Sequence, residues 1–290
     1  MRRYLSDDDD SARWDGFPFR DGDIVISTRS KSGTTWMQMI CALLVFGTPD
    51  LPAPLSELSP WVDHTVEPVA DVLARLAAQR HRRFVKTHTP LDGIPLDGRA
   101  TYVVVARHPL DLAVSLYHQG DNLDRRRLAE LTGVPVRPAR PRPSAHDWLV
   151  SWTQQETTAQ EQPDSLVGVL HHLGDAWTRR ASGADVVLVH YADLSADLPG
   201  EMRRLAERLG IEVSPERLRG LAEAATFAAM RLRSAELSPN ALGVLKDSAA
   251  FFRSGRSGAG SELLTAPELA AYEERVARLA PPDLVTWLHR

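Results

Sequence analysis

Residues 23–36 read DIVISTRSKSGTTW, and this stretch decides the fold of the chain. Its β-branched apolar run at 24–26 favours a buried strand. Gly33 permits a sharp turn, and an apolar helix is predicted over 34–46. A strand, a glycine-containing loop and a helix N-terminus together favour anion binding, because the first helical amides are unpaired and the helix dipole attracts negative charge. The stretch therefore predicts a phosphate-binding loop in an α/β fold.

This loop departs from the phosphate loop of ATP and GTP enzymes, which needs Gly, four residues, Gly, Lys and then Ser or Thr. Thr28 stands in place of the first Gly, and the lysine lies upstream of Gly33, at Lys31. The sequence Lys-Ser-Gly-Thr-Thr-Trp instead resembles the 5′-phosphosulfate loop of sulfotransferases that use 3′-phosphoadenosine 5′-phosphosulfate (PAPS). The nucleotide contacts implied by this resemblance are Lys31, Ser32, Gly33, Thr34, Thr35 and Trp36.

The composition is that of a globular protein with room for a sizeable core. The chain has 290 residues, of which 43% are hydrophobic and 25% charged. Its net charge of −4 predicts no affinity for nucleic acid, so an anionic ligand needs a local basic pocket. The single cysteine, Cys41, excludes a disulfide framework within the chain. No signal-peptide core and no apolar run of about 20 residues is present, so we expect a cytoplasmic protein without a membrane span.

Strands alternate with helices along the chain, which predicts a mostly parallel central sheet flanked by helices. Further strands are predicted over 83–86, 101–106 and 185–191, and helices over 69–79, 110–118, 146–160, 165–180, 201–209 and 267–279, with another opening at 214. We expect a single domain over 1–290, with a mobile acidic arm over 1–20. The Arg- and Pro-rich segment 120–146 is predicted to be a flexible substrate lid, and a solvated linker is the alternative.

Polar residues follow the carboxyl ends of the predicted strands, where parallel sheets bind ligands. Transfer of a sulfonate group needs an anion cradle, a cation near the leaving oxygen and a base for the acceptor. Residues 86–88, Lys-Thr-His, are similar to the catalytic element of sulfotransferases. The resemblance implies that His88 is the general base and that Lys31 and Lys86 stabilise the transferring group and the leaving oxygen. A purely structural histidine is the alternative.

Residues 102–115 resemble the family motif that binds the 3′-phosphate of the nucleotide. The resemblance implies that the fork of Arg107 grips this phosphate and that Ser115 adds a donor. An ion pair between Arg107 and Asp111 is the structural alternative. Many phosphate-loop enzymes carry a carboxylate for magnesium after this strand, whereas this chain carries Arg107, so no metal is expected.

Residues 251–258 look like the family's Arg-Lys-Gly segment, which also closes over the 3′-phosphate. Arg253 and Gly255 match, Ser254 replaces the usual Lys, and Arg256 is a candidate for the missing charge. The other nucleotide contacts implied by the resemblance are Tyr191, Thr226 and Phe227, with Phe227 and Trp36 sandwiching the adenine.

The resemblance spans about residues 20–265, and the chain is identified as a PAPS-dependent sulfotransferase of the cytosolic, bacterial type, with a fold like that of phosphate-loop NTPases. The implied reaction moves sulfonate to a hydroxyl or amine of a small molecule and leaves 3′,5′-adenosine bisphosphate (PAP). The family's short dimer motif is broken at Ser261, Ala266 and Ala270, with Thr265 kept, so the oligomeric state is open.

Two other functions stay open from the sequence: a phosphate-loop kinase or NTPase, which would bind ATP with magnesium, and a non-catalytic nucleotide-binding module. The acceptor is also open. Candidates for an apolar acceptor pocket, which would suit a phenol, an alcohol or a lipid-like molecule, are Trp61, Phe84, His118, Trp148 and Trp152.

Overall fold

The computed structural model describes residues 1–133, 135, 141–240 and 242–290. At its centre is a sheet with the strand order β2-β1-β3-β4, in which all neighbouring strands are parallel. The strands are β1 (Asp23–Thr28), β2 (Phe84–Thr87), β3 (Ala100–Ala106) and β4 (Val186–His190). All their residues are buried, as expected for a parallel sheet covered on both faces. The predicted α/β fold with a parallel central sheet is confirmed.

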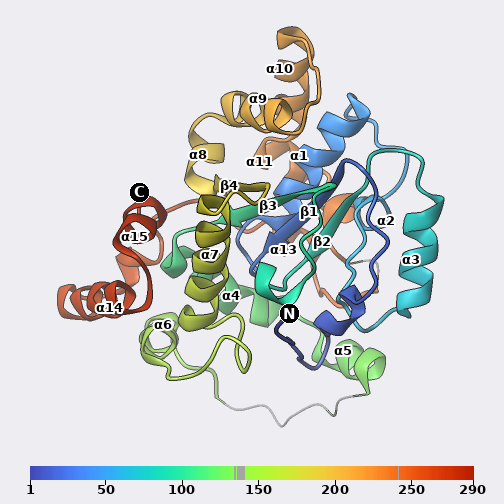
Figure 1. Cartoon of the computed structure of the whole chain (residues 1–290). Helices are drawn as coiled ribbons and strands as arrows, with labels where there is room; N and C mark the ends of the chain where they lie inside the picture. Colours follow the sequence, from blue (N-terminus) through green and yellow to red (C-terminus); the bar gives the residue numbers. More distant parts are fainter. Residues whose placement is uncertain (134, 136–140, 241) are drawn as a thin grey trace.

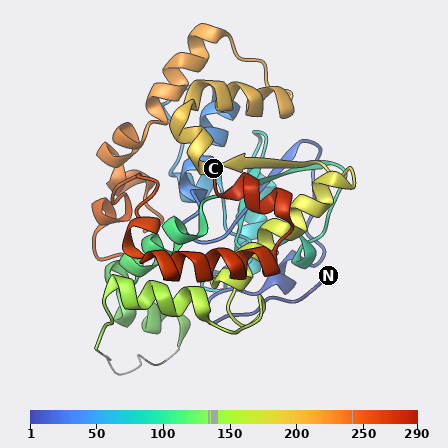
Figure 2. The ribbon, with the colours of Figure 1, turned by 90° about the vertical axis from the view of Figure 1, so that its left-hand side faces the viewer.

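Two apolar clusters lie on opposite faces of this sheet, because successive strand side chains point to opposite sides. One face packs against α1 (Thr34–Phe46), α9 (Leu198–Arg208) and α10 (Pro215–Ala224) (Figure 1). The other packs against α4 (Pro109–Asn122), α6 (Ala145–Gln154), α7 (Leu166–Ala181), α14 (Ala266–Leu279) and α15 (Pro282–Leu288). Figure 2 shows the red helix α14 alongside the green α6, with which it is in contact.

The remaining helices are short. They are α2 (Leu55–Leu58), α3 (Val69–Ala78), α5 (Arg125–Thr132), α8 (Tyr191–Ala196), α11 (Phe227–Leu232), α12 (Ser234–Leu237), α13 (Ser248–Phe251) and the 3₁₀ turns η1 (Ser11–Trp14), η2 (Leu91–Gly93) and η3 (Ser261–Leu263). The predicted helices are all present, but α15 and most of the short helices were not predicted. Pro282 occupies the first turn of α15, where its missing amide costs nothing. None of the described helices is long and apolar enough to cross a bilayer.

The N-terminal segment 1–20 differs from the mobile acidic arm that we expected. The side chains of Tyr4 and Trp14 are 4% and 0% exposed, and Trp14 packs against Phe17 at 4.7 Å between ring centroids. The Tyr4 hydroxyl donates to the carboxylate of Asp92 at 2.8 Å. Burial of these aromatic side chains outweighs the preference of the acidic run for water, so the segment packs against the rest of the chain.

The predicted lid, 120–146, contains one described helix, α5, between α4 and α6. Asp124 caps α5 by accepting from the amides of Arg126 and Arg127, and Gly133 ends it in a left-handed conformation. Residues 134 and 136–140 of this segment lie outside the described part of the chain. A role as a substrate lid therefore stays a prediction, as does the single domain over 1–290.

Candidate active site

The loop between β1 and α1 is shaped to leave the first amides of α1 available to a ligand. Gly33 has a φ of 109°, in the left-handed region that favours glycine, and no side chain caps the helix. A Cβ on Gly33 would lie only 3.1 Å from the ring of Tyr191, so the chain passes close to the start of α8 here. Lys31 also has a positive φ, of 64°, and backbone strain of this kind is typical of functional loops.

Positive charge is concentrated beside this loop. The Nζ atom of Lys31 donates to Oε1 of Gln119 at 3.2 Å and lies 4.0 Å from the ring centroid of Phe251. Burial, followed by the charges of Arg107, Arg253 and Lys86, lowers the pKa of Lys31 to about 7. The contributions of Arg107, Arg253 and Lys86 to this shift come from cations that lie near Lys31.

Arg107, which follows β3, makes only backbone hydrogen bonds in the described part of the chain. Its guanidinium donates to the carbonyl of Arg256 at 3.0 Å and to that of Lys31 at 3.4 Å, and its Cζ lies 4.4 Å above the ring of Tyr191. Its Nε is buried without a partner among the described residues. Neither Lys31 nor Arg107 forms an ion pair with a described carboxylate, so the local charge suits an anionic ligand.

Asp111 does not pair with Arg107, which removes the structural alternative. Its buried carboxylate instead accepts from the amides of Gly258 and Gly260, at 2.8 and 3.0 Å. Gly260 is packed so tightly that a Cβ there would lie 2.4 Å from the backbone of Leu110. Asp111 thereby fixes the segment 253–260 against the start of α4, next to Arg107.

We expect Asp111→Ala to loosen segment 253–260, because two amides lose a charged acceptor. The loss should lower the free energy of unfolding by about 2–3 kcal/mol. It should also raise hydrogen exchange at Gly258 and Gly260, measured by mass spectrometry. Glu262→Ala is the matched control. Glu262 is an exposed acid of the same region, and its single ion pair, with Arg256, is long, at 3.8 Å, and also exposed. Equal exchange in the two variants would contradict this role of Asp111.

His88 lies just after β2 and is held in one tautomer. Its Nδ1 is 2.6 Å from the carbonyl of Thr28, and since a carbonyl only accepts, Nδ1 carries the proton and Nε2 is left to accept another. Burial, then the charges of Lys86 and Arg29, lower the pKa of His88 well below its usual range. The ring is therefore neutral at neutral pH, as a base must be.

Trp61 connects Lys86 with His88. The Nζ atom of Lys86 lies 3.6 Å from the Trp61 ring centroid, and the His88 ring meets the same indole edge-on at 4.7 Å. Burial lowers the pKa of Lys86 to about 8, although the carboxylates of Asp9 and Asp63 oppose this shift. The structure thus brings the two predicted catalytic residues of this strand end into one packed cluster.

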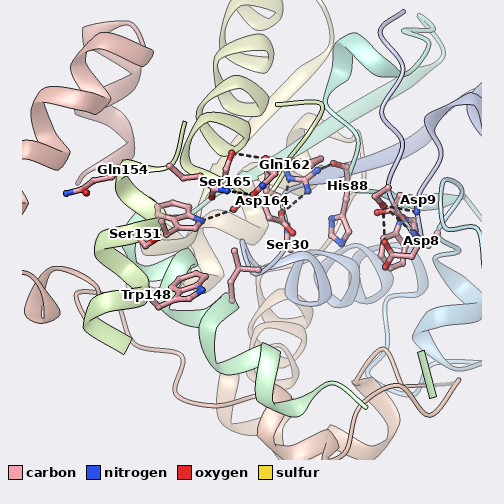
Figure 3. A pocket seen from close by; sticks show the side chains of 17 residues that line it. Asp8, Asp9, Ser30, His88, Trp148, Ser151, Gln154, Gln162, Asp164 and Ser165 are labelled. Carbon is pink, nitrogen blue, oxygen red and sulfur yellow. Dashed lines mark hydrogen bonds and ion pairs between the residues drawn. The ribbon is translucent and has the colours of Figure 1, made fainter. Parts of the chain in front are cut away.

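A cavity of about 920 Å³ opens at His88. Figure 3 shows Asp8 and Asp9 on one side of His88 and Trp148, Ser151 and Gln154 on the other. Trp61 and Trp152 also line the cavity, as predicted. The cavity is mixed in character, because Ser, Gln and Asp side chains share the wall with the three indoles. Of the other two candidates, Phe84 is fully buried in the core and His118 is not among the lining residues.

The remaining predicted nucleotide contacts lie around the loop. Trp36 donates from Nε1 to the carbonyl of Ala225 at 2.8 Å and meets Tyr191 edge-on at 5.0 Å. Phe227 packs on Gly255, where a Cβ would lie 2.9 Å from the ring. Within the described contacts, Trp36 and Phe227 do not form a ring pair, so the adenine sandwich stays a prediction.

The other predicted contacts differ in their local roles. Ser115 lies on α4 one turn before Gln119, the residue that contacts Lys31. Ser254 lies, half-buried, between Arg253 and Gly255. The buried loop members Ser32 and Thr34 differ in that Thr34 also shares a 2.6 Å hydrogen bond with Thr28.

Thr226 is exposed, and its hydroxyl is engaged in capping α11, where it accepts from the amide of Ala229 and donates to the carbonyl of Glu223. Thr35 lies in the first turn of α1.

A family model described as the sulfotransferase domain matches residues 21–277. This chain belongs to the sulfotransferase family. It is 45% identical to a glycolipid sulfotransferase of Mycobacterium bovis, over 97% of this chain and 91% of that protein. The predicted family and transferase activity are confirmed, and the kinase and non-catalytic alternatives are set aside.

Solved structures show the same fold. The structure of retinol dehydratase in complex with retinol and PAP superposes with a TM-score of 0.70 at 22% identity, covering 93% of this chain and 84% of that one. A mouse sulfotransferase complexed with PAP superposes with a TM-score of 0.68 at 19% identity, covering 96% and 90%.

Sequence reasoning missed several residues that support the sulfotransferase site. Asp63 is fully buried and accepts from the hydroxyls of Thr87 and Thr89, both at 2.7 Å, on either side of His88. Arg29 donates to the carbonyl of His88 and pairs with Asp164 at 2.7 Å. The threonines flanking His88 were a signal for a buried acceptor, but nothing local identified which carboxylate it would be.

In the described part of the chain no cluster of His, Cys, Asp or Glu could hold a metal ion, and the absence of a metal requirement stays a prediction.

Proposed function

We propose that this sulfotransferase moves sulfonate from PAPS to a hydroxyl group of a lipid-like acceptor and leaves PAP. The observation that carries the proposal is a group of cations, Lys31 and Arg107 with Arg253, that form no ion pair with a described carboxylate. They lie at the uncapped start of α1 and next to the His88 cluster. Two solved neighbours hold PAP, and the similar mycobacterial proteins are named glycolipid sulfotransferases. These names favour an acceptor with a sugar headgroup and a lipid tail.

The described residues fit the charges of PAPS, which would supply the activated sulfonate group. The amides of residues 32–35 and the Lys31 ammonium suit the 5′-phosphosulfate. Arg107 and Arg253 suit the 3′-phosphate, and the partnerless Nε of Arg107 is a donor that such a phosphate could satisfy. Ser115 would add a donor from α4. Tyr191, Trp36 and Phe227 offer aromatic surface for the adenine.

His88 would take the proton of the acceptor hydroxyl at Nε2, while the Thr28 carbonyl holds the other ring nitrogen in place. Its lowered pKa makes it a weak base in the free protein, and part of that lowering comes from Lys86 and Arg29. A bound polyanion would offset these charges and raise the pKa of His88 toward neutrality. Lys31 and Lys86 would stabilise the charge that develops on the leaving oxygen.

The affinity for PAP should fall as pH rises from 7 to 9. Below pH 7 Lys31, whose pKa is about 7, is already charged in the free protein. Above pH 7 the free protein has lost this proton, whereas the bound anion favours the charged lysine. Binding must then recruit a proton, and affinity falls by up to about tenfold per pH unit. Calorimetry in buffers of different ionisation enthalpy measures this uptake. A pH-independent affinity would contradict the lowered pKa, and Lys31→Arg should flatten the profile.

The reaction itself is tested by incubating the protein with PAPS and a neutral galactosyl lipid. We expect a product with the mass of one added sulfonate, formed together with an equal amount of PAP. His146→Ala serves as a control, because His146 lies at the surface, bonded to Glu268 and away from the cavity. PAPS binding without sulfation of any hydroxyl-bearing lipid would overturn the proposed acceptor class, and no PAPS binding would overturn the proposed donor.

A further inference from the structure

We propose that Asp8 and Asp9 make the acceptor site selective for neutral, hydroxyl-rich headgroups and against anionic ones. This inference rests on the proposed function and adds the charge of the acceptor and the residues that set it. It concerns the N-terminal segment, which the sequence alone suggested was free in solvent. The structure instead places part of that segment in the wall of the reaction cavity.

The acidic residues reach the cavity because the fold holds their segment on both sides. Tyr4 is buried on one side, and Trp14 on the other. Between them, the amide of Ser6 donates to the carbonyl of Asp9 at 2.8 Å, and the Ser6 hydroxyl donates to the Asp8 carboxylate at 3.0 Å. Asp9 also forms an isolated antiparallel bridge with His64. This turn lies opposite the polar wall formed by α6 and residues 162–165 (Figure 3).

The charges of the cavity wall do not cancel. Among the described lining residues the acids are Asp8, Asp9 and Asp164, and the only strong base is Arg29. Arg29 is already paired with Asp164 at 2.7 Å. Asp8 and Asp9 both line the cavity and form no ion pair with a described residue, so they keep hydrogen-bonding capacity for a ligand.

The surroundings of Asp9 disfavour a negative charge on its carboxyl group. Its Oδ1 is buried without a hydrogen-bond partner in the described residues. Burial, then the charges of Asp63 and Asp8, raise the pKa of Asp9 to about 8, although the smaller contributions of Arg29 and Lys86 oppose this shift. A carboxylate on a ligand at this position would meet the same burial and the same acids. A sugar hydroxyl would not, because it can both donate to Asp8 and accept from a protonated Asp9.

The two ends of the site therefore carry opposite charge: cations lie around Lys31 and Arg107, and the Asp8 carboxylate, next to a protonated Asp9, lies at the far side of His88. An anionic acceptor would be repelled from the acidic end. A sulfated product is itself an anion, so the same acids would favour its departure and oppose a second transfer to the same headgroup.

The test compares octyl glucoside with octyl glucuronide, which differ in that a carboxylate replaces one hydroxymethyl group. Their binding is measured by calorimetry in the presence of PAP, and their turnover with PAPS. The wild-type protein should bind the glucoside about tenfold more tightly, as expected for one added charge near an acid in a partly hydrated cavity. The double variant Asp8→Asn/Asp9→Asn should bring the two affinities close together. Asp7→Asn is the matched control, because Asp7 belongs to the same run but is exposed and outside the cavity wall.

Equal discrimination by the double variant and the wild type would overturn the inference, as would no preference in the wild type or no binding of either sugar. A binding preference that disappears only in the double variant supports the inference. If that preference is seen without any turnover of PAPS, the proposed reaction fails while the assigned charge selectivity stands.

Discussion

Replacing His88 with alanine is expected to lower kcat by about 10²- to 10⁴-fold, the usual contribution of a positioned general base. PAP affinity should change little, because the His88 ring makes no contact with Lys31, Arg107 or Arg253 among the described residues. The ring lines the acceptor cavity, and its one hydrogen bond toward the loop goes to the backbone carbonyl of Thr28. Steady-state rates with saturating PAPS, together with PAP calorimetry, measure the two effects separately.

His88→Asn and His146→Ala are the companion variants for this experiment. Asparagine can keep a donor near Thr28 but cannot act as a base, so its kcat should fall as far as that of the alanine variant. His146→Ala should keep full activity. A parallel loss of PAP affinity and turnover in His88→Ala would show a structural role and would sink the assignment of His88 as base.

Arg107→Ala should weaken PAP binding by about 10²-fold or more, because it removes a buried, charge-assisted contact to a phosphate. ADP, which lacks the 3′-phosphate, should lose much less affinity. The selectivity for PAP over ADP should therefore collapse together with the affinity. The basis is the nearly buried guanidinium of Arg107, which has backbone partners for two nitrogens and none among the described residues for Nε.

Arg256→Ala separates this claim from a general effect of positive charge. The Arg256 side chain is exposed, and only its backbone carbonyl contacts Arg107. We expect its removal to leave the selectivity for PAP over ADP intact. If Arg256→Ala lost this selectivity and Arg107→Ala kept it, the 3′-phosphate would have to be assigned to the 253–260 segment.

The sequence predicted the sheet and the loop well because their signals are local. The β-branched runs at 101–106 and 186–189 and the glycine turn at Gly33 each determine their own conformation with little help from distant residues. The strand ends then had to meet at one edge of the sheet, so the approach of Lys31, Lys86 and Arg107 followed from topology.

The parts that could not be predicted depend on contacts between residues far apart in the chain. Nothing near Asp111 indicates that its carboxylate binds the amides of Gly258 and Gly260. The acidic run 7–10 is typical of solvated segments, and only the burial of Tyr4 and Trp14 places it beside His88. The polar character of the cavity has the same origin, since its two walls come from the N-terminus and from residues 148–165.

The measurement that tests the central claim most directly is calorimetric binding of PAP beside ADP and ATP, with and without magnesium. The account predicts tight binding of PAP that does not depend on the metal, with ADP and ATP much weaker, because Arg107 and Arg253 recognise the 3′-phosphate. Preferential binding of ATP with magnesium would contradict it and would require a different role for the cations around Lys31.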